Sequence, residues 1–466
     1  MNKIKKIITF SIFLLLAVSI HAQTCIKKYS FIASEIRDCS IDHEGNYIIS
    51  GAFLNNCMLF KLNSQGDSLW AKYYYPNTIG IVESGKLFKS IKITDTNEYI
   101  AAGSFGVNNA FIVKTNANGD TIWTKLIPCN GYIAGENILL LPDGNILLTG
   151  QTSCDTEASD IIDAFLAKID GQTGQIIWQR NYLTSLFNGT YYATQATKVV
   201  QVQDGYLILA NYGWDGPFTI GLSGSMYLIK TDFNGFMQWD RKNFGCFAYV
   251  SNLEVLPDGN LLVCGSGCGS GHFFAKLHNN GDTIWTRSYD ALIGTSPLIR
   301  DILVADNRYL LAGGIHKGLL IETDTSGNIV WRREEYPNVD LLEKTFKDTV
   351  GLISIGYNRT LGIYDYIYFI KTDSTGYYQG LGTHSTSTVP ISVYPNPAAN
   401  TLSINHQNLP TAQTVELYNL TGQLVLQQNL QQNNTTISVA GLQVGVYMLQ
   451  IKAGNTLAQQ KVVVWR

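Results

Sequence analysis

A segment of about fifty residues recurs along the chain, and this recurrence limits the fold more than any other feature of the sequence. Each unit contains a glycine that is followed four residues later by a tryptophan. The pairs are Gly66/Trp70, Gly119/Trp123, Gly174/Trp178, Gly235/Trp239, Gly281/Trp285 and Gly327/Trp331. The tryptophans are 53, 55, 61, 46 and 46 residues apart. A seventh unit differs at its end, since Gly376 is followed at the tryptophan position by Gly380.

Each unit predicts four short strands that are separated by turns. Pro142-Asp143-Gly144-Asn145 is typical of these turns, because glycine, asparagine and aspartate tolerate a positive φ. Four strands repeated at this period are typical of a propeller blade. The sequence therefore predicts an all-β fold, with a seven-bladed β-propeller over residues 23–383. The 11% aromatic and 15% charged residues agree with such a fold and argue against a coiled coil.

The repeated tryptophans are expected to pack between neighbouring blades, as large apolar side chains. These structural residues are Trp70, Trp123, Trp178, Trp239, Trp285 and Trp331. Together with the turn before them, as in residues 170–178, they resemble the tryptophan-docking repeats of quinoprotein-like propellers. The resemblance covers the blade scaffold only. It matches no residue that would hold a quinone or its metal, so no cofactor and no metal site is expected.

The first residues after the N-terminal apolar run resemble the end of a repeat. Cys25-Ile26-Lys27-Lys28-Tyr29 parallels Trp70-Ala71-Lys72-Tyr73-Tyr74, with Cys25 at the tryptophan position. This strand is predicted to be the outer strand of the seventh blade. Ring closure by both ends of the repeat region removes an exposed sheet edge.

Residues 1–22 have the pattern of a signal peptide. Lys3, Lys5 and Lys6 precede an apolar run over 7–20, and Ala22 precedes the predicted cleavage site. A run of 14 residues is shorter than the roughly 20 that span a bilayer, which disfavours a membrane anchor. No later stretch reaches that length. The mature protein is therefore expected to be secreted, either extracellular or attached to the outer-membrane surface.

All eight cysteines follow the signal peptide, and an even number in an exported chain permits disulfides. Buried free thiols are the other interpretation for most of them. Cys264 and Cys268 are the closest pair in sequence, and no spacing is typical of a zinc site. The cysteines are Cys25, Cys39, Cys57, Cys129, Cys154, Cys246, Cys264 and Cys268.

The composition changes at a polar linker over residues 384–390, and residues 391–466 predict a small Ig-like β-sandwich. Its expected strands are 391–394, 401–405, 414–419, 423–429, 435–439, 445–453 and 456–464. Three stretches, 393–400, 415–423 and 442–451, resemble in order the motifs of the type A C-terminal sorting domain of the Bacteroidetes type IX secretion system. The motif residues are Tyr394, Pro395, Asn396, Pro397, Gly422, Gly445 and Tyr447.

This resemblance implies a translocation signal that is recognised by the type IX outer-membrane translocon. A C-terminal signal peptidase then removes it, and the body is anchored or released. An ordinary appended Ig-like domain is the alternative. The net charge is −3 and no basic patch is present, which argues against nucleic acid as a partner.

The sequence contains no HExxH, GxSxG or P-loop motif. The glycine-rich run 264–271 lies between two predicted strands, so it favours a hairpin over a phosphate-binding loop. Asp155, Glu157, Asp160 and Asp163 crowd one loop, where a solvated loop is favoured over a calcium site.

Two sets of loops vary in length and are rich in aromatic residues: those between the second and third strands of a blade, and those between successive blades. Propeller topology brings both sets to the same face. An elaborated aromatic face is typical of a binding surface. The candidate ligand-binding residues are Tyr74, Tyr191, Tyr192, Tyr212, Trp214 and Asp215. The alternative is that these rings pack their own loops.

The function that these observations favour is a non-catalytic binding module for extracellular glycan or protein, with no catalytic residues assigned. A propeller-based enzyme, such as a glycosidase or polysaccharide lyase, would need two suitably spaced carboxylates, for which Asp155, Asp160 and Asp215 are candidates. A structural adhesion component is the third interpretation.

Overall fold

The computed structural model describes nineteen segments of the chain, in which every regular element is a strand. The chain divides into two compact units, 1–378 and 379–466. No helix that could cross a membrane is found in the described segments. The described segments are residues 24–30, 34–76, 85–106, 108–154, 162–182, 193–213, 225–243, 247–267, 271–290, 298–314, 316–334, 336–349, 351–360, 363–378, 392–405, 414–419, 424–430, 434–453 and 456–465.

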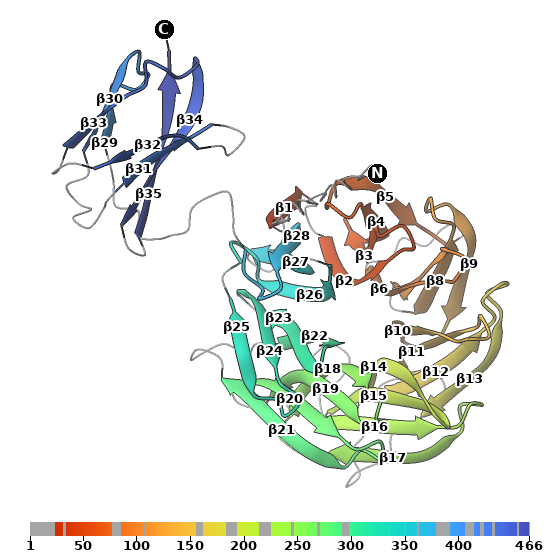
Figure 1. Cartoon of the computed structure of the whole chain (residues 1–466). Helices are drawn as coiled ribbons and strands as arrows, with labels where there is room; N and C mark the ends of the chain where they lie inside the picture. The colour runs from red at the N-terminus through yellow and green to blue at the C-terminus, as the bar shows by residue number, and fades with distance from the viewer. Residues whose placement is uncertain are drawn as a thin grey trace, which may run out of the picture. The chain divides into compact units, whose positions relative to one another are not determined.

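In the first unit, five consecutive stretches each form a four-stranded antiparallel sheet whose strands follow chain order (Figure 1). The first two sheets contain β2 (Ser34–Ile41), β3 (Tyr47–Phe53), β4 (Asn56–Leu62), β5 (Ser68–Tyr74), β6 (Lys86–Ile93), β7 (Tyr99–Phe105), β8 (Asn109–Thr115) and β9 (Thr121–Pro128). The next two contain β10 (Ile133–Leu140), β11 (Ile146–Thr152), β12 (Asp163–Ile169), β13 (Ile176–Tyr182), β14 (Ala193–Val202), β15 (Gly205–Gly213), β16 (Ser225–Thr231) and β17 (Met237–Asn243). The fifth contains β18 (Phe247–Val255), β19 (Leu261–Gly267), β20 (Gly271–Leu277) and β21 (Thr283–Asp290). β19 and β20, on either side of residues 268–270 of the glycine-rich run, pair antiparallel, and residues 268–270 lie outside the described residues.

The remaining strands of this unit form an eight-stranded sheet that consists of two sets of four. A single residue pair, Gly314 with Leu341, joins the two sets. The sets are β22 (Leu298–Ala305), β23 (Arg308–Gly314), β24 (Gly318–Thr323) and β25 (Ile329–Arg333), and then β26 (Leu341–Lys347), β27 (Gly351–Thr360), β28 (Ile363–Asp373) and β1 (Cys25–Ser30).

The N-terminal strand completes the last of these sets. β1 pairs antiparallel with β28 from Cys25 opposite Lys371 to Ser30 opposite Tyr366. The prediction that residues 25–29 add to the last sheet of the repeat region is therefore confirmed. The edge of β28 is covered by a strand that lies more than 330 residues earlier in the chain.

The sheets are arranged in a ring (Figure 1). Within the described residues, each first strand contacts the first strand of the next set, in the order β2, β6, β10, β14, β18, β22 and β26, and β26 contacts β2 again. The first unit is therefore propeller-like. Its second and third strands are almost entirely buried, as β7 and β8 show, because neighbouring sheets cover both their faces.

The repeated tryptophan packs against the glycine of the next sheet. A Cβ atom on Gly119 would lie 2.8 Å from the ring of Trp70, and one on Gly235 would lie 2.7 Å from Trp178. Only glycine fits there, and its φ is close to +78° at both positions. The same contact joins Trp123 to Gly174, Trp285 to Gly327 and Trp331 to Gly376. At Gly66 the neighbour is Phe369, since Cys25 occupies the tryptophan position.

A tyrosine hydroxyl adds a hydrogen bond at most of these contacts. Tyr182 donates to the carbonyl oxygen of Gly235 at 2.9 Å, and Tyr289 donates to that of Gly327 at 2.7 Å. The ring is buried between the sheets, and the hydroxyl satisfies a carbonyl at the turn. Equivalent bonds join Tyr29 to Gly66, Tyr74 to Gly119 and Tyr336 to Gly376.

The second unit consists of two sheets that share one core. The strands are β29 (Ser392–Tyr394), β30 (Thr401–Asn405) and β33 (Asn434–Ser438) in one sheet, and β31 (Thr414–Tyr418), β32 (Leu424–Asn429), β34 (Gly445–Ala453) and β35 (Thr456–Val464) in the other. Leu402 from the first sheet and Leu417 and Leu449 from the second are fully buried in this core. The alternation of buried and exposed residues in β30, β31 and β33 produces it.

We predict that Gly119→Ala destabilises the protein more than Gly144→Ala. Both glycines have a φ close to +78°, so both substitutions cost about 1–2 kcal/mol of backbone strain. A Cβ atom at Gly144 has nothing within 4 Å, whereas one at Gly119 meets Trp70. For Gly119→Ala, the overlap should add about 1–3 kcal/mol to the loss of unfolding free energy. Urea unfolding of the two variants measures this difference. Equal losses for the two variants would contradict the role assigned to the tryptophan contact.

Candidate functional site

The first strand of every set contains a bulge near its middle. At each, the pairing with the second strand slips by one residue. A bulge leaves one residue out of the ladder and redirects its side chain. Since these first strands contact one another around the ring, the bulges bring polar residues together at its centre. The bulged residues are Arg37, Lys89, Glu136, Thr197, Ser251, Arg300 and Glu343.

The residue after the bulge links one first strand to the next. Asp38 accepts a hydrogen bond from the backbone N–H of Ile91 at 3.1 Å, and Ser90 accepts one from Ile138 at 3.3 Å. Asn137 and Asp301 do the same for Val199 and Thr345. These side chains satisfy backbone donors on strand edges that have no neighbouring strand. The centre is therefore held by side-chain contacts, and not by a continuous ladder.

Two pairs of neighbouring bulged residues carry opposite charges and contact each other. Lys89 pairs with Glu136 at 2.5 Å, and the Arg300 guanidinium lies 3.7 Å from Glu343. Arg37 pairs with Glu35 of the same strand. Burial alone would lower the pKa of Lys89, but Glu136 and Tyr132 together outweigh it and raise that pKa. We refer to the seven bulged residues, Arg37, Lys89, Glu136, Thr197, Ser251, Arg300 and Glu343, as the central ring.

A second group of charges lies one or more residues further along these strands. Lys92 and Lys344 contact Asp38 and Asp301 at 3.4 Å and 2.6 Å, and Lys198 lies 3.5 Å from Glu254. Burial tends to raise the pKa of Asp38, but the ammonium groups of Lys92 and Lys344 outweigh it and lower that pKa. The carboxylate is thus ionised at neutral pH and holds these cations together.

Glu343 differs from the other carboxylates of the central ring. Its side chain is 4% exposed, and its Oε1 atom has no hydrogen-bond partner in the part of the chain that the structure describes. Burial raises the pKa of Glu343, although Arg300 and Arg37 oppose the shift. Glu343 is therefore a buried carboxyl group whose hydrogen-bonding capacity is only partly used within the described residues.

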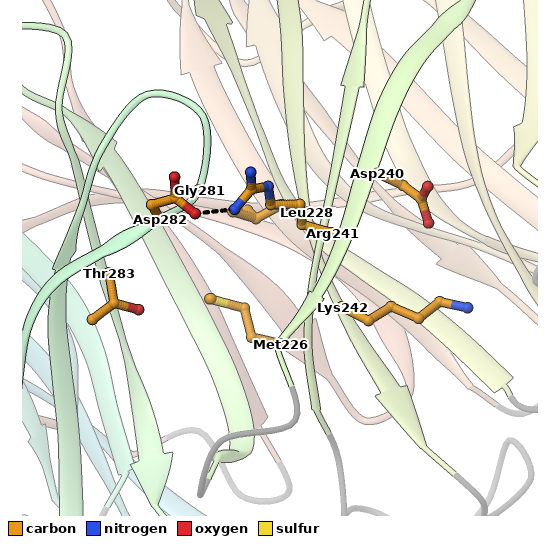
Figure 2. Close-up of a pocket in the computed structure, with 8 residues that line it drawn as sticks. All are labelled: Met226, Leu228, Asp240, Arg241, Lys242, Gly281, Asp282 and Thr283. Carbon is orange, nitrogen blue, oxygen red and sulfur yellow. Dashed lines mark hydrogen bonds and ion pairs between the residues drawn. The ribbon is translucent and has the colours of Figure 1, made fainter.

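A separate pocket of about 490 Å³ lies where the sheet β14–β17 meets the sheet β18–β21. Figure 2 shows Arg241 of β17 pointing toward Asp282, with which it forms an ion pair, and Met226 pointing toward Thr283. Asp240 and Lys242 point the other way from β17. The lining residues are Met226, Leu228, Asp240, Arg241, Lys242, Gly281, Asp282 and Thr283.

Two of the candidate ligand-binding residues lie in the interior. Tyr74 is 3% exposed and donates to Gly119, and Tyr212 is 4% exposed and packs against Tyr227. Both rings pack between strands and are not presented on a surface. The other candidates, Tyr191, Tyr192, Trp214 and Asp215, lie outside the described residues, and so do Asp155, Glu157 and Asp160. Asp163 is buried at the start of β12.

Within the described segments, no cluster of three or more His, Cys, Asp or Glu side chains could hold a metal ion. Cys129 and Cys154 form a disulfide, with their Cα atoms 5.4 Å apart. Cys25, Cys39, Cys57 and Cys264 are free thiols, and all except Cys25 are buried. Cys246 and Cys268 lie outside the described residues. Both interpretations of the cysteines therefore occur in this chain.

The sorting motifs form part of the second unit's framework. The Asn396 side chain accepts a hydrogen bond from the backbone of Val463 at 2.8 Å, so the first motif secures the last strand. The Tyr447 hydroxyl donates to the carbonyl oxygen of Gln443 at 2.7 Å, and Gly445 begins β34. Tyr394 is the last residue of β29, directly before Pro395, and its side chain is 54% exposed. Pro397 follows Asn396 directly, and Gly422 lies outside the described residues.

Residues 392–465 match the family described as the secretion system C-terminal sorting domain. Such a domain implies export by type IX secretion machinery to the cell surface or the extracellular space. No curated protein matches the chain.

Solved structures to which the chain shows similarity include the extracellular domain of the one-component system protein BT4673 from B. thetaiotaomicron, at 14% identity and a TM-score of 0.43. That match covers 93% of this chain and 57% of the other, so the chain spans little more than half of that relative. The WD40 β-propeller domain of Doa1 matches at 12% identity and a TM-score of 0.46, over 77% of this chain and 99% of the other. A protein of unknown function from Bacteroides caccae matches at 16% identity and a TM-score of 0.40, over 62% of this chain and 93% of the other.

We predict that Asp38→Asn lowers the free energy of unfolding by about 3 kcal/mol at neutral pH, because buried cations lose their partner. The pKa of Asp38 is depressed in the folded protein. The stabilisation that the Asp38 carboxylate provides is therefore fully present above the unfolded-state pKa of about 3.9. It is lost as the pH falls through the lower pKa of the folded state. Denaturant unfolding from pH 7 to pH 3 should show the two proteins converging. The control Asp67→Asn removes an exposed pair with Lys27 and should change little. A loss that is independent of pH would contradict the assignment.

Proposed function

We propose that this chain is a seven-bladed β-propeller of the tryptophan-docking type whose body serves as a non-catalytic binding module for extracellular glycan or protein. The domain boundaries that we propose are a signal peptide over 1–22, the propeller over 23–383, a linker over 384–390 and an Ig-like sorting domain over 391–466. Support for the blades comes from the closed circle of first strands and from the tryptophan contacts between sheets.

The observation that carries the binding role is the central ring. Seven bulges in equivalent positions bring guanidinium, ammonium, carboxylate and hydroxyl groups together. Such a set of donors and acceptors suits the hydroxyl groups of a sugar or the backbone and side chains of a peptide. The repetition of the bulge at a place where it costs ladder hydrogen bonds favours a function there.

We propose that the aromatic loops lie at the end of the sheets where the first strands begin. Connections between sheets enter there, and connections between second and third strands turn there. The residues proposed to add ligand contacts from these loops are Tyr191, Tyr192, Trp214 and Asp215. The proposed source is a member of the Bacteroidetes, in which the partners during export are the outer-membrane translocon and the C-terminal signal peptidase.

One observation favours the second candidate, a propeller-based glycosidase or lyase. Glu343 is buried, its pKa is raised, and it lies at the ring centre beside Arg300, as expected of a general acid. Glu35 and Asp38 are close enough to contribute to that shift. A glycosidase mechanism needs a second carboxylate at a defined separation, and Glu35 is the candidate for that role.

The test is a glycan array and a peptide array, each probed with the full chain, followed by titration of each hit. Binding without turnover supports the proposal. Glu136→Gln should weaken binding at least tenfold, because it removes one charged partner at the central ring. The matched control Glu322→Gln alters a peripheral pair with Arg308 and should leave the affinity unchanged. No binding to any glycan or peptide would overturn the proposal, and turnover that Glu343→Gln abolishes would establish the enzyme instead.

A further inference from the structure

The outer strand of each sheet in the first unit has one edge that no strand covers in the described part of the chain. Such an edge exposes unpaired N–H and C=O groups, and proteins protect it with charged side chains, prolines or bulges. Five of the outer strands have a polar residue directly after the repeat tryptophan, which interrupts any apolar stripe there. These residues are Thr124, Gln179, Asp240, Thr286 and Arg332.

The outer strand β5 differs from these five. Leu69 and Tyr73 are 50% and 39% exposed, and Ala71, which follows the repeat tryptophan, is exposed as well. Tyr75, directly after the strand, is 51% exposed. Alternate residues of a strand share one face, so these four side chains form a continuous stripe, which we call the β5 stripe. Phe53 widens it, because its ring stacks on Tyr73 at a centroid distance of 5.7 Å. Figure 1 shows β5 on the outer side of the ring.

The length and sequence of β5 make it complementary to a second copy of itself. The strand spans seven residues, Ser68–Tyr74, and Ala71 is the middle one. Two identical strands that pair antiparallel about their middle residue are related by a two-fold axis, the commonest symmetry of protein dimers. Leu69 of each copy would then lie opposite Tyr73 of the other, and such a pair of an apolar and an aromatic side chain is favourable. Ala71 would lie opposite Ala71, where its small side chain leaves room for the tyrosines.

Lys72 is the one charged residue of β5, and its charge does not oppose this pairing. In the same register it would lie opposite Trp70 of the second copy, and not opposite another lysine. Its ammonium group already contacts Asp120 of the next sheet at 2.6 Å and lies 5.7 Å from the centre of the Trp70 ring. Self-pairing of β17 or β25 about the residue after the tryptophan would instead place Asp240 or Arg332 opposite its own copy. Like charges directly opposite each other are destabilising.

We propose that two copies of this chain associate through β5, so that two four-stranded sheets join into one continuous sheet across a two-fold axis. The second copy would cover both the free edge of β5 and the β5 stripe. The central ring remains open in both copies, because β2, which carries Arg37, lies at the opposite edge of this sheet. The test of the dimer is therefore independent of the proposed function. One strand pair makes a small interface, so the dimer should depend on protein concentration.

Sedimentation equilibrium of the full chain from about 1 μM to about 100 μM should show a reversible monomer–dimer equilibrium. Tyr73→Lys places a charge in the β5 stripe and should weaken dimerisation about tenfold or more. Ser288→Lys, at the same exposed position of β21, is the matched control and should leave the equilibrium unchanged. Thermal unfolding checks that both variants are folded. A chain that stays monomeric over this range would overturn the proposal and leave the β5 stripe to a different partner. Dimerisation that folded Tyr73→Lys leaves undiminished would overturn it as well.

A cross-link tests the register without relying on a charged variant. Residues directly opposite each other in an antiparallel pair have Cα atoms about 4.5–5.5 Å apart, which is within the range that a disulfide bridges. Ala71→Cys should therefore form a disulfide-linked dimer under mild oxidation. Thr286→Cys, at the same exposed position of β21, controls for the native thiols and should not. Equal amounts of linked dimer in the two variants would contradict pairing through β5.

Discussion

The contact between a tryptophan ring and a glycine in the next sheet is the interaction on which the rest of the first unit depends. A Cβ atom on that glycine would lie 2.7–2.9 Å from the ring at five junctions, so the contact specifies both residues. It also fixes the distance between neighbouring sheets, and the tyrosine hydroxyl then fixes their registration. Once the sheets are spaced in this way around a circle, their first strands converge and their polar bulges meet at the centre.

The repeat and its closure could be predicted from the sequence because they depend on local pattern. Cys25 and Tyr29 match the spacing of Trp70 and Tyr74, and this match correctly predicted that β1 completes the sheet of β28. The seven strands expected after residue 390 are all present, with bounds that differ by at most one residue. Alternating burial and turn residues determine such elements locally, so no distant contact was needed to find them.

The site residues could not be predicted equally well, because their roles depend on partners far away in the chain. Tyr74 was expected in a ligand-binding face, but its hydroxyl bonds Gly119, 45 residues away, inside the protein. The central ring was missed altogether. Its signal is present as an apolar residue followed by two polar ones, as in Ile36-Arg37-Asp38 and Ile299-Arg300-Asp301. This pattern breaks strand alternation and indicates a bulge, although it does not reveal which charges will pair across the ring.

The central claim is that the ring of sheets is closed by the strand Cys25–Ser30, and the most direct measurement is the thermal unfolding of the chain with and without residues 23–31. Deletion exposes the edge of β28 and removes the Tyr29 hydroxyl from Gly66. Tyr29→Phe, which removes only the hydroxyl, provides the control for that second effect. The account predicts a markedly lower melting temperature for the deletion and a smaller decrease for Tyr29→Phe. An unchanged melting temperature for the deletion would contradict it.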